Sequence, residues 1–383
     1  MGNRFESLKK YLDTNIARFG VQGVDLSVWQ DHQEIFRHST GYGDIEKKTP
    51  LAPDAIYNLY SATKVITGVA AMQFVERGDI RLLDPLEWYI PEFKNMKIKY
   101  GTFAIAPAKN PIRVADLLTM TSGITYDPDT PEIRALIQET GGTFDTLTFA
   151  KTIAKMPLLF EPGTGWNYGY NMDVMGAVIE VASGKKFGAY LKEHIFDPLG
   201  MTDTMFPRSL SPAQRARRAP QYLYNVETGK AERVGDDPYG CEFPASMHEG
   251  GGGQLVSTVR DYSAFVDALA CGGTGKTGAR ILTERSIWLM SQNRLNEAQL
   301  LELHRLSASA GFGYGLGVAP AFDPAATCTL VPKGAFYWPG VGGVHNLVDP
   351  GNKLSFFMAH NTIFGPVPAI FHGILNVIYA AVG

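Results

Sequence analysis

The chain has 383 residues, more than one typical domain, so two lobes or one domain with a large insertion are expected. Its formal net charge is −3, and its lysines and arginines are scattered rather than clustered. This balance argues against nucleic acid or an anionic membrane as a partner and favours a neutral or small substrate.

Cysteine usage points to free thiols. Cys241, Cys271 and Cys328 are odd in number and widely spaced, so neither a disulfide framework nor a metal site is expected. His32 is interpreted as a solvated surface residue because no second ligand stands at metal spacing in the sequence. The N-terminus lacks the apolar core of a signal peptide, which predicts a cytoplasmic location.

The first part of the chain has the pattern of a helix followed by a hairpin. Apolar residues recur at helical spacing over residues 5–19 and then alternate with polar ones over 24–28. A polar turn at 31–33 and an apolar return at 35–36 complete the predicted antiparallel hairpin.

A serine and a lysine open the next helical pattern. Lys64 follows Ser61 by about one helical turn, so both side chains lie on one face and an amine comes beside a hydroxyl. Unpaired N–H groups in the first turn of a helix favour the oxyanion that acyl transfer creates. One interpretation is therefore a nucleophilic Ser61, and the other is a serine that only caps the helix.

Strand-like alternation stops near residue 84 and returns after residue 250. Between them, helices are predicted at 114–120, 131–139, 148–155, 172–183 and 187–196. Later strands are predicted at 254–258, 313–318, 334–348 and 354–360, and later helices at 260–269, 283–292 and 368–382. The last helix is too short and too interrupted to span a membrane.

This order predicts an α/β fold with an inserted lobe. Residues 1–84 and 238–383 are expected to form a discontinuous α/β lobe, in which helices flank an antiparallel sheet. Residues 85–237 are expected to form a mostly helical insertion, with the active site in the cleft between the two lobes.

A loop rich in turn residues and aromatics precedes the predicted helix at 172–183. Within it, Tyr168 is a candidate general base, because a phenol beside a lysine ammonium can take a proton and later return it. The alternative is that Trp166, Tyr168 and Tyr170 are ordinary core aromatics.

A third block, FYWPGVGGVHNLVDP, occupies residues 336–350. Glycine inside a strand marks a close backbone approach. A substrate along this predicted edge strand would place its carbonyl oxygen between the N–H groups of Val341 and Ser61, an oxyanion hole. A glycine-weakened edge strand without a function is the alternative.

With these three blocks in this order, the sequence resembles the serine β-lactamase-like hydrolases. It is similar to class C β-lactamases and more similar to family VIII carboxylesterases, over nearly the whole chain. The resemblance implies that Ser61 is the acylated nucleophile, Lys64 the motif lysine, and Tyr168 the tyrosine of the Y-x-N or Y-x-x motif. It also implies the fold of the penicillin-recognising enzymes.

Two positions depart from the β-lactamase pattern. Trp338, followed by Pro339 and Gly340, stands where β-lactamases have K-T-G and these esterases have W-G-G or a relative. Tyr170 replaces the asparagine of Y-x-N. Both missing groups serve β-lactam recognition, so esters are the expected substrates. The candidate pocket walls, which favour an apolar or aromatic ester, are Trp88, Tyr89, Tyr126, Trp166, Tyr170, Tyr239 and Trp338.

The resemblance therefore predicts an intracellular serine carboxylesterase that acts on small, largely apolar esters through an acyl-enzyme on Ser61. This chemistry needs no cofactor and no metal. Three alternatives stay open: acyl transfer to another acceptor in the same site, activity like that of β-lactamases or D-amino-acid peptidases, and a non-catalytic scaffold or binding role. The oligomeric state is left open.

Overall fold

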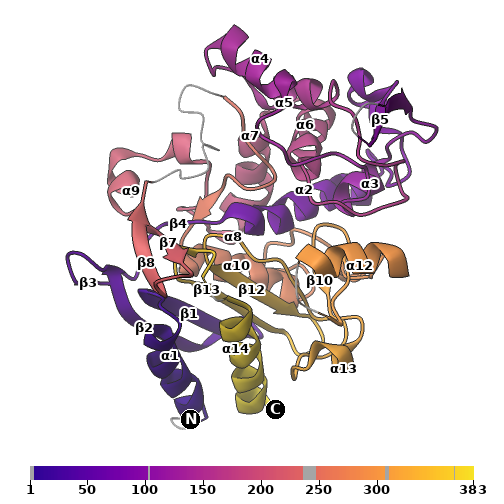
Figure 1. Ribbon diagram of the computed structural model, residues 1–383. Helices are drawn as coiled ribbons and strands as arrows, with labels where there is room; N and C mark the ends of the chain where they lie inside the picture. The colour runs from indigo at the N-terminus through magenta and orange to yellow at the C-terminus, as the bar shows by residue number, and fades with distance from the viewer. Residues whose placement is uncertain (1–3, 102–103, 236–246, 307–309, 366) are drawn as a thin grey trace.

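An antiparallel sheet built from both ends of the chain forms the lower half of the computed structural model (Figure 1). The structure describes residues 4–101, 104–235, 247–306, 310–365 and 367–383, so Tyr239 and Cys241 lie outside the described residues. Within those ranges the sheet has seven strands in the order β10-β11-β12-β13-β1-β2-β3. Their bounds are β1 (Gly23–Gln30), β2 (Gln33–Asp44), β3 (Thr49–Pro50), β10 (Ala319–Pro320), β11 (Phe336–Tyr337), β12 (Val344–Asp349) and β13 (Leu354–Ala359).

Helices cover both faces of this sheet. Successive strand residues point to opposite faces, and on β13 both Phe356 and Phe357 are fully buried. The Phe357 ring stacks on Tyr262 of α10 (Val259–Ala270) at 4.4 Å, while Phe356 lies 6.0 Å from Phe371 of α14 (Val367–Val382). The first helix, α1 (Glu6–Arg18), packs beside α14 (Figure 1).

The upper half of the molecule is mostly helical (Figure 1). Between this half and the sheet runs α2 (Thr63–Arg77), whose residues 63–74 are all buried. The upper helices are α3 (Val114–Leu118), α4 (Pro131–Thr140), α5 (Thr146–Ile153), α6 (Asn171–Ser183) and α7 (Phe187–Leu191). The other helices are α8 (Asp197–Leu199), α9 (Pro212–Ala216), α11 (Glu284–Met290), α12 (Glu297–Leu306) and α13 (Pro324–Thr327).

The predicted absence of strands between residues 85 and 237 is wrong. Two hairpins lie there, β5 (Lys97–Tyr100) with β6 (Ala104–Pro107), and β7 (Gln221–Asn225) with β8 (Lys230–Val234). Parallel pairing of β7 with β14 (Thr362–Ile363) attaches the second hairpin to the C-terminal segment. The division into lobes at residues 84/85 and 237/238 stays a prediction.

Two other predicted strands also differ from those in the structure. Residues 313–318 lie outside any strand, and the predicted strand 334–348 is split into β11 and β12 by a turn at 341–343. Pro339 cannot donate to a ladder, and Gly343 has a φ of 92°, which suits a turn rather than a strand. In the described ranges, no helix is long and apolar enough to cross a membrane.

One tyrosine joins the sheet to the start of α2. The Tyr262 hydroxyl is buried and donates to the Ala62 carbonyl oxygen at 2.8 Å. We expect Tyr262→Phe to lower the free energy of unfolding by about 1 kcal/mol, because the ring still packs while one hydrogen bond is lost. Urea denaturation measures this change. The control is Tyr42→Phe, on a ring that is 45% exposed, which should stay within about 0.5 kcal/mol of the wild type. Equal effects of the two substitutions would contradict the assignment.

Candidate active site

Ser61 lies in a short 3₁₀ turn, Tyr60–Ala62, between a strand and α2. The strand is β4 (Tyr57–Asn58), which pairs with β9 (Val256–Ser257). The backbone N–H of Leu59 donates to the Leu255 carbonyl oxygen at 2.9 Å. These bonds fix the serine turn to the segment that follows the four consecutive glycines 250–253.

The residue before Ser61 has a strained backbone. Tyr60 has a φ of 45°, a left-handed conformation that costs a non-glycine residue roughly 1–3 kcal/mol at such sites. Its buried hydroxyl donates to Gln221 Oε1 on β7 at 2.6 Å, which anchors the side chain. The strained turn leaves the Ser61 side chain partly exposed at the start of the helix.

Lys64 has no exposed surface and lies against Ser61. Its amine donates to Ser61 Oγ at 3.2 Å and to the Gly252 carbonyl oxygen at 2.5 Å. The amine also lies 4.5 Å from the centroid of the Tyr168 ring and 5.7 Å from that of Tyr126. The structure therefore brings together the three candidate catalytic residues of the sequence, Ser61, Lys64 and Tyr168.

The buried carboxyl group of Asp173 is linked to Lys64 through the backbone of Gly252. The Gly252 N–H donates to Asp173 Oδ1 at 3.3 Å, so one glycine residue links Asp173 to Lys64. Burial raises the pKa of the Asp173 carboxyl to about 6, and the charge of Lys64 and the Gly252 N–H act in the opposite direction. A Cβ at position 252 would lie 2.3 Å from Asp173 Oδ2, so any residue other than glycine would displace the Asp173 carboxyl group.

The phenol oxygen of Tyr168 has a specific donor. The Trp338 indole N–H donates to it at 3.0 Å. The fully buried Asn346 holds the Trp338 backbone by accepting from its N–H at 3.2 Å and donating to its carbonyl oxygen at 2.7 Å. The Tyr314 ring meets the Trp338 ring edge-on at 4.8 Å. Trp338 is therefore positioned to stabilise negative charge on the phenol oxygen.

The two predicted oxyanion donors are the backbone N–H groups of Ser61, in the 3₁₀ turn, and of Val341, in the turn between β11 and β12. The Val341 segment packs against the residues that precede Ser61, since a Cβ at Gly340 would lie 2.1 Å from the Leu59 carbonyl oxygen. This close approach requires glycine and fits the predicted oxyanion hole. The segment is not an edge strand, because β10 lies beyond β11 in the sheet.

Stacked aromatic rings form one wall of the site. The Tyr126 ring stacks on Tyr170 at 4.5 Å and on Tyr168 at 5.8 Å, and its side chain is 40% exposed. Trp88 does not join this wall. It is 61% exposed and lies under the guanidinium of Arg81, lining a separate surface pocket.

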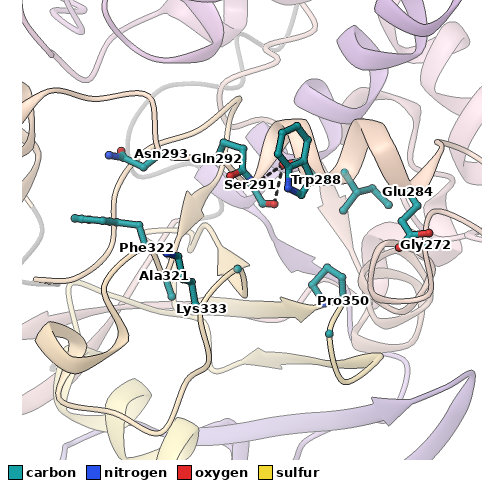
Figure 2. Close-up of a pocket in the computed structure, with 13 residues that line it drawn as sticks. Gly272, Glu284, Trp288, Ser291, Gln292, Asn293, Ala321, Phe322, Lys333 and Pro350 are labelled. Carbon is teal, nitrogen blue, oxygen red and sulfur yellow. Dashed lines mark hydrogen bonds between the residues drawn. The ribbon is translucent and has the colours of Figure 1, made fainter.

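A pocket of about 410 Å³ lies elsewhere on the molecule (Figure 2). Figure 2 shows Trp288, Ser291 and Gln292 on one side of it, and Phe322 and Lys333 on another. None of its lining residues belongs to the group around Ser61. Reactive groups identify a site more specifically than volume does, so the Ser61 group remains the candidate active site.

Sequence reasoning missed several contributors to this site. Asp173 lies at the start of the predicted helix 172–183 and Asn346 lies in the block 336–350, but both side chains bind backbone N–H groups, which sequence patterns do not indicate. The run of glycines at 250–253 was the available signal, because consecutive glycines indicate a close approach of backbone to another group.

The model of the Beta-lactamase family matches residues 8–377. The chain belongs to this family. Esterase EstB of Burkholderia gladioli is 29% identical over 359 residues, covering 87% of this chain and 84% of the esterase. Acyltransferase calJ of Penicillium decumbens is 28% identical over 366 residues, covering 89% of this chain and 84% of that protein.

A solved structure shows the same fold as this Beta-lactamase-family protein. EstCE1, described as a hydrolase with promiscuous acyltransferase activity, superposes with a TM-score of 0.81 over 98% of each chain, at 23% identity. The fold class that the resemblance implied is thereby confirmed.

The buried Asp173 predicts a specific pH dependence of stability. Its native pKa of about 6 lies above the unfolded value of about 3.9, so the native state binds more protons between these values. Stability from this group is present below about pH 4 and is lost as the pH rises to about 6, by up to about 3 kcal/mol. Asp173→Asn should therefore flatten the fall in unfolding free energy between about pH 4 and 6.

Urea denaturation across this pH range measures that slope. Asp129→Asn, at a side chain that is 77% exposed, provides the control and should keep the wild-type slope. An unchanged slope in Asp173→Asn would contradict the raised pKa.

Proposed function

We propose that this Beta-lactamase-family protein is a serine carboxylesterase whose nucleophile is Ser61. The observation that carries the proposal is the buried Lys64 amine, which donates to Ser61 Oγ and lies against the Tyr168 ring. A hydroxyl in hydrogen-bond contact with an amine, and a phenol ring beside that amine, provide a nucleophile and a proton carrier without a metal or cofactor.

The reaction proceeds through an acyl-enzyme. The Tyr168 phenolate takes the proton from Ser61 Oγ as that oxygen attacks the ester carbonyl carbon. The oxyanion of the tetrahedral intermediate accepts hydrogen bonds from the Ser61 and Val341 N–H groups. Collapse of the intermediate releases the alcohol, which takes its proton from Tyr168. Water then enters by the same steps and releases the carboxylic acid.

Neutral esters fit this site better than β-lactams. A β-lactam brings a carboxylate, and an unpaired charge is costly to bury. At the two positions where β-lactamases have lysine and asparagine, this chain has Trp338 and Tyr170. Trp338 donates its only side-chain N–H to Tyr168, and Tyr170 stacks on Tyr126, so both contribute apolar surface. An acyl chain of modest size, packed against these rings, is the proposed substrate group.

Acyl transfer is a second candidate function. The similarity to acyltransferase calJ supports it, and the same acyl-enzyme serves both reactions. The two differ only in whether water or another alcohol or amine attacks the acyl group. Product analysis with a competing alcohol separates them, because transfer yields a new ester while hydrolysis yields only the acid.

Lys64 and Tyr168 are expected to act as one proton-transfer unit. We expect Lys64→Ala and Tyr168→Phe each to lower kcat/KM for a short p-nitrophenyl ester by about 10³- to 10⁴-fold. The double variant should be little worse than either single one, because each change already disables the unit. Lys333→Ala, at an exposed lysine, serves as the control and should keep wild-type turnover. Losses that multiply in the double variant would contradict the shared role.

Substrate preference provides a second test. Loss of one charge-assisted and one neutral hydrogen bond is worth roughly 2–4 kcal/mol, or about 30- to 1,000-fold in discrimination. We expect kcat/KM for a short p-nitrophenyl ester to exceed that for the cephalosporin nitrocefin by a factor within this range, centred on about 100-fold. Trp338→Lys should narrow this gap only modestly, since Tyr170 is unchanged. Equal kcat/KM for both substrates in the wild type would contradict this preference and would show that another cation binds the nitrocefin carboxylate.

A further inference from the structure

The turn between β1 and β2 meets the C-terminal end of α10 in a cluster of three ligand-type side chains. His32 Nδ1 lies 2.8 Å from Asp267 Oδ2, and the His32 backbone N–H donates to Asp267 Oδ1 at 3.2 Å. The Cys271 thiol donates to Asp267 Oδ1 at 3.8 Å. One ligand atom from each residue lies within 4.8 Å of the others. No residue of the Ser61 site takes part.

Local structure explains why these residues meet. Asp267 lies in the last turn of α10 and Cys271, four residues later, is the C-cap of that helix, so the two side chains come close together. Asp31 and His32 have φ values of 47° and 65°, the pair of left-handed residues that a tight hairpin turn requires. Sequence spacing could not indicate these neighbours of His32, because Asp267 lies 235 residues further along the chain.

The charge of Asp267 lacks a permanent partner. Its side chain is 1% exposed, and among the described residues its only ion-pair partner is the His32 imidazole. Asp25 provides a contrast, since its equally buried carboxylate lies 2.6 Å from the guanidinium of Arg37. A buried carboxylate without a cation is costly, so a bound cation would stabilise this cluster.

We propose that His32 Nδ1, the Asp267 carboxylate and Cys271 Sγ bind a zinc ion, with water as the fourth ligand. Nitrogen, oxygen and sulfur donors together suit Zn²⁺ rather than Ca²⁺ or Mg²⁺. Zinc bonds of about 2.0–2.3 Å in a tetrahedron hold ligand atoms roughly 3.4–3.6 Å apart. The His32–Asp267 contact opens by less than an ångström to meet this spacing, and side-chain rotation provides the movement.

The cluster is open to entry of an ion from solvent. The His32 side chain is 29% exposed and Cys271 is partly exposed. Gly272, the next residue, lines the pocket in Figure 2. On binding, the Cys271 thiol proton passes to solvent and the imidazole proton moves to Nε2. The ion then joins the β1–β2 turn to α10 and stabilises the sheet half of the molecule.

Zinc titration of the reduced, metal-free, untagged full chain tests the proposal. Competition with a chromophoric chelator is expected to reveal one equivalent of bound zinc, and Co²⁺ in its place is expected to give a thiolate-to-metal charge-transfer band. His32→Gln and Cys271→Ser should each weaken zinc binding by at least about tenfold, since even groups beyond the ligand shell contribute 10- to 100-fold. Cys271→Ser should also abolish the cobalt band.

Matched controls come from the same chain. His38→Gln alters a histidine that also lies 2.8 Å from a carboxylate, that of Asp13, and Cys328→Ser removes an exposed thiol. Both should bind zinc as the wild type does. Ester turnover of Cys271→Ser should equal that of the wild type, which verifies that the variant is folded and that the site is separate from Ser61. Absence of zinc binding, or equal binding by the wild type and Cys271→Ser, would overturn the proposal.

Discussion

The side chain of Lys64 ends in a space without solvent contact, and the surrounding segments are arranged to accept its amine. A buried amine needs acceptors and compensating charge, because burial alone is costly. Here the Gly252 carbonyl oxygen and Ser61 Oγ accept its hydrogen bonds, aromatic faces lie beside it, and the Asp173 carboxyl stands behind Gly252. The residues that bind and surround the Lys64 amine are therefore the same residues that are proposed to carry out the reaction.

The sheet determines where these groups stand. Tyr262 stacks on the sheet residue Phe357 and donates to Ala62, one residue after the serine. Asn346, on the neighbouring strand and in register with Phe357, holds Trp338 and thereby the donor to Tyr168. Sheet register thus fixes both sides of the proposed site. The Tyr60 side chain is buried and its hydroxyl is bound to Gln221, and these contacts hold the strained turn in place.

The helices could be predicted from the sequence, whereas contacts between residues far apart in the sequence could not. Helical spacing located α1, α4, α6, α10 and α14 to within a few residues, because amphipathic periodicity depends only on residues that are close together in the sequence. The hairpins inside 85–237 were missed, since short strands that pair locally lack a long alternating run. The motif spacing indicated Ser61, Lys64 and Tyr168, whereas the His32 cluster depends on a contact across 235 residues that no spacing reveals.

The central claim is that Ser61 becomes acylated, and intact-protein mass spectrometry tests it most directly. The wild-type chain is incubated with a fluorophosphonate, or quenched during turnover of a short p-nitrophenyl ester, and compared with Ser61→Ala. The account predicts one covalent adduct per chain in the wild type, located by peptide mapping on Ser61, and none in the variant. An adduct of equal yield in Ser61→Ala, or one that maps to another residue, would contradict it.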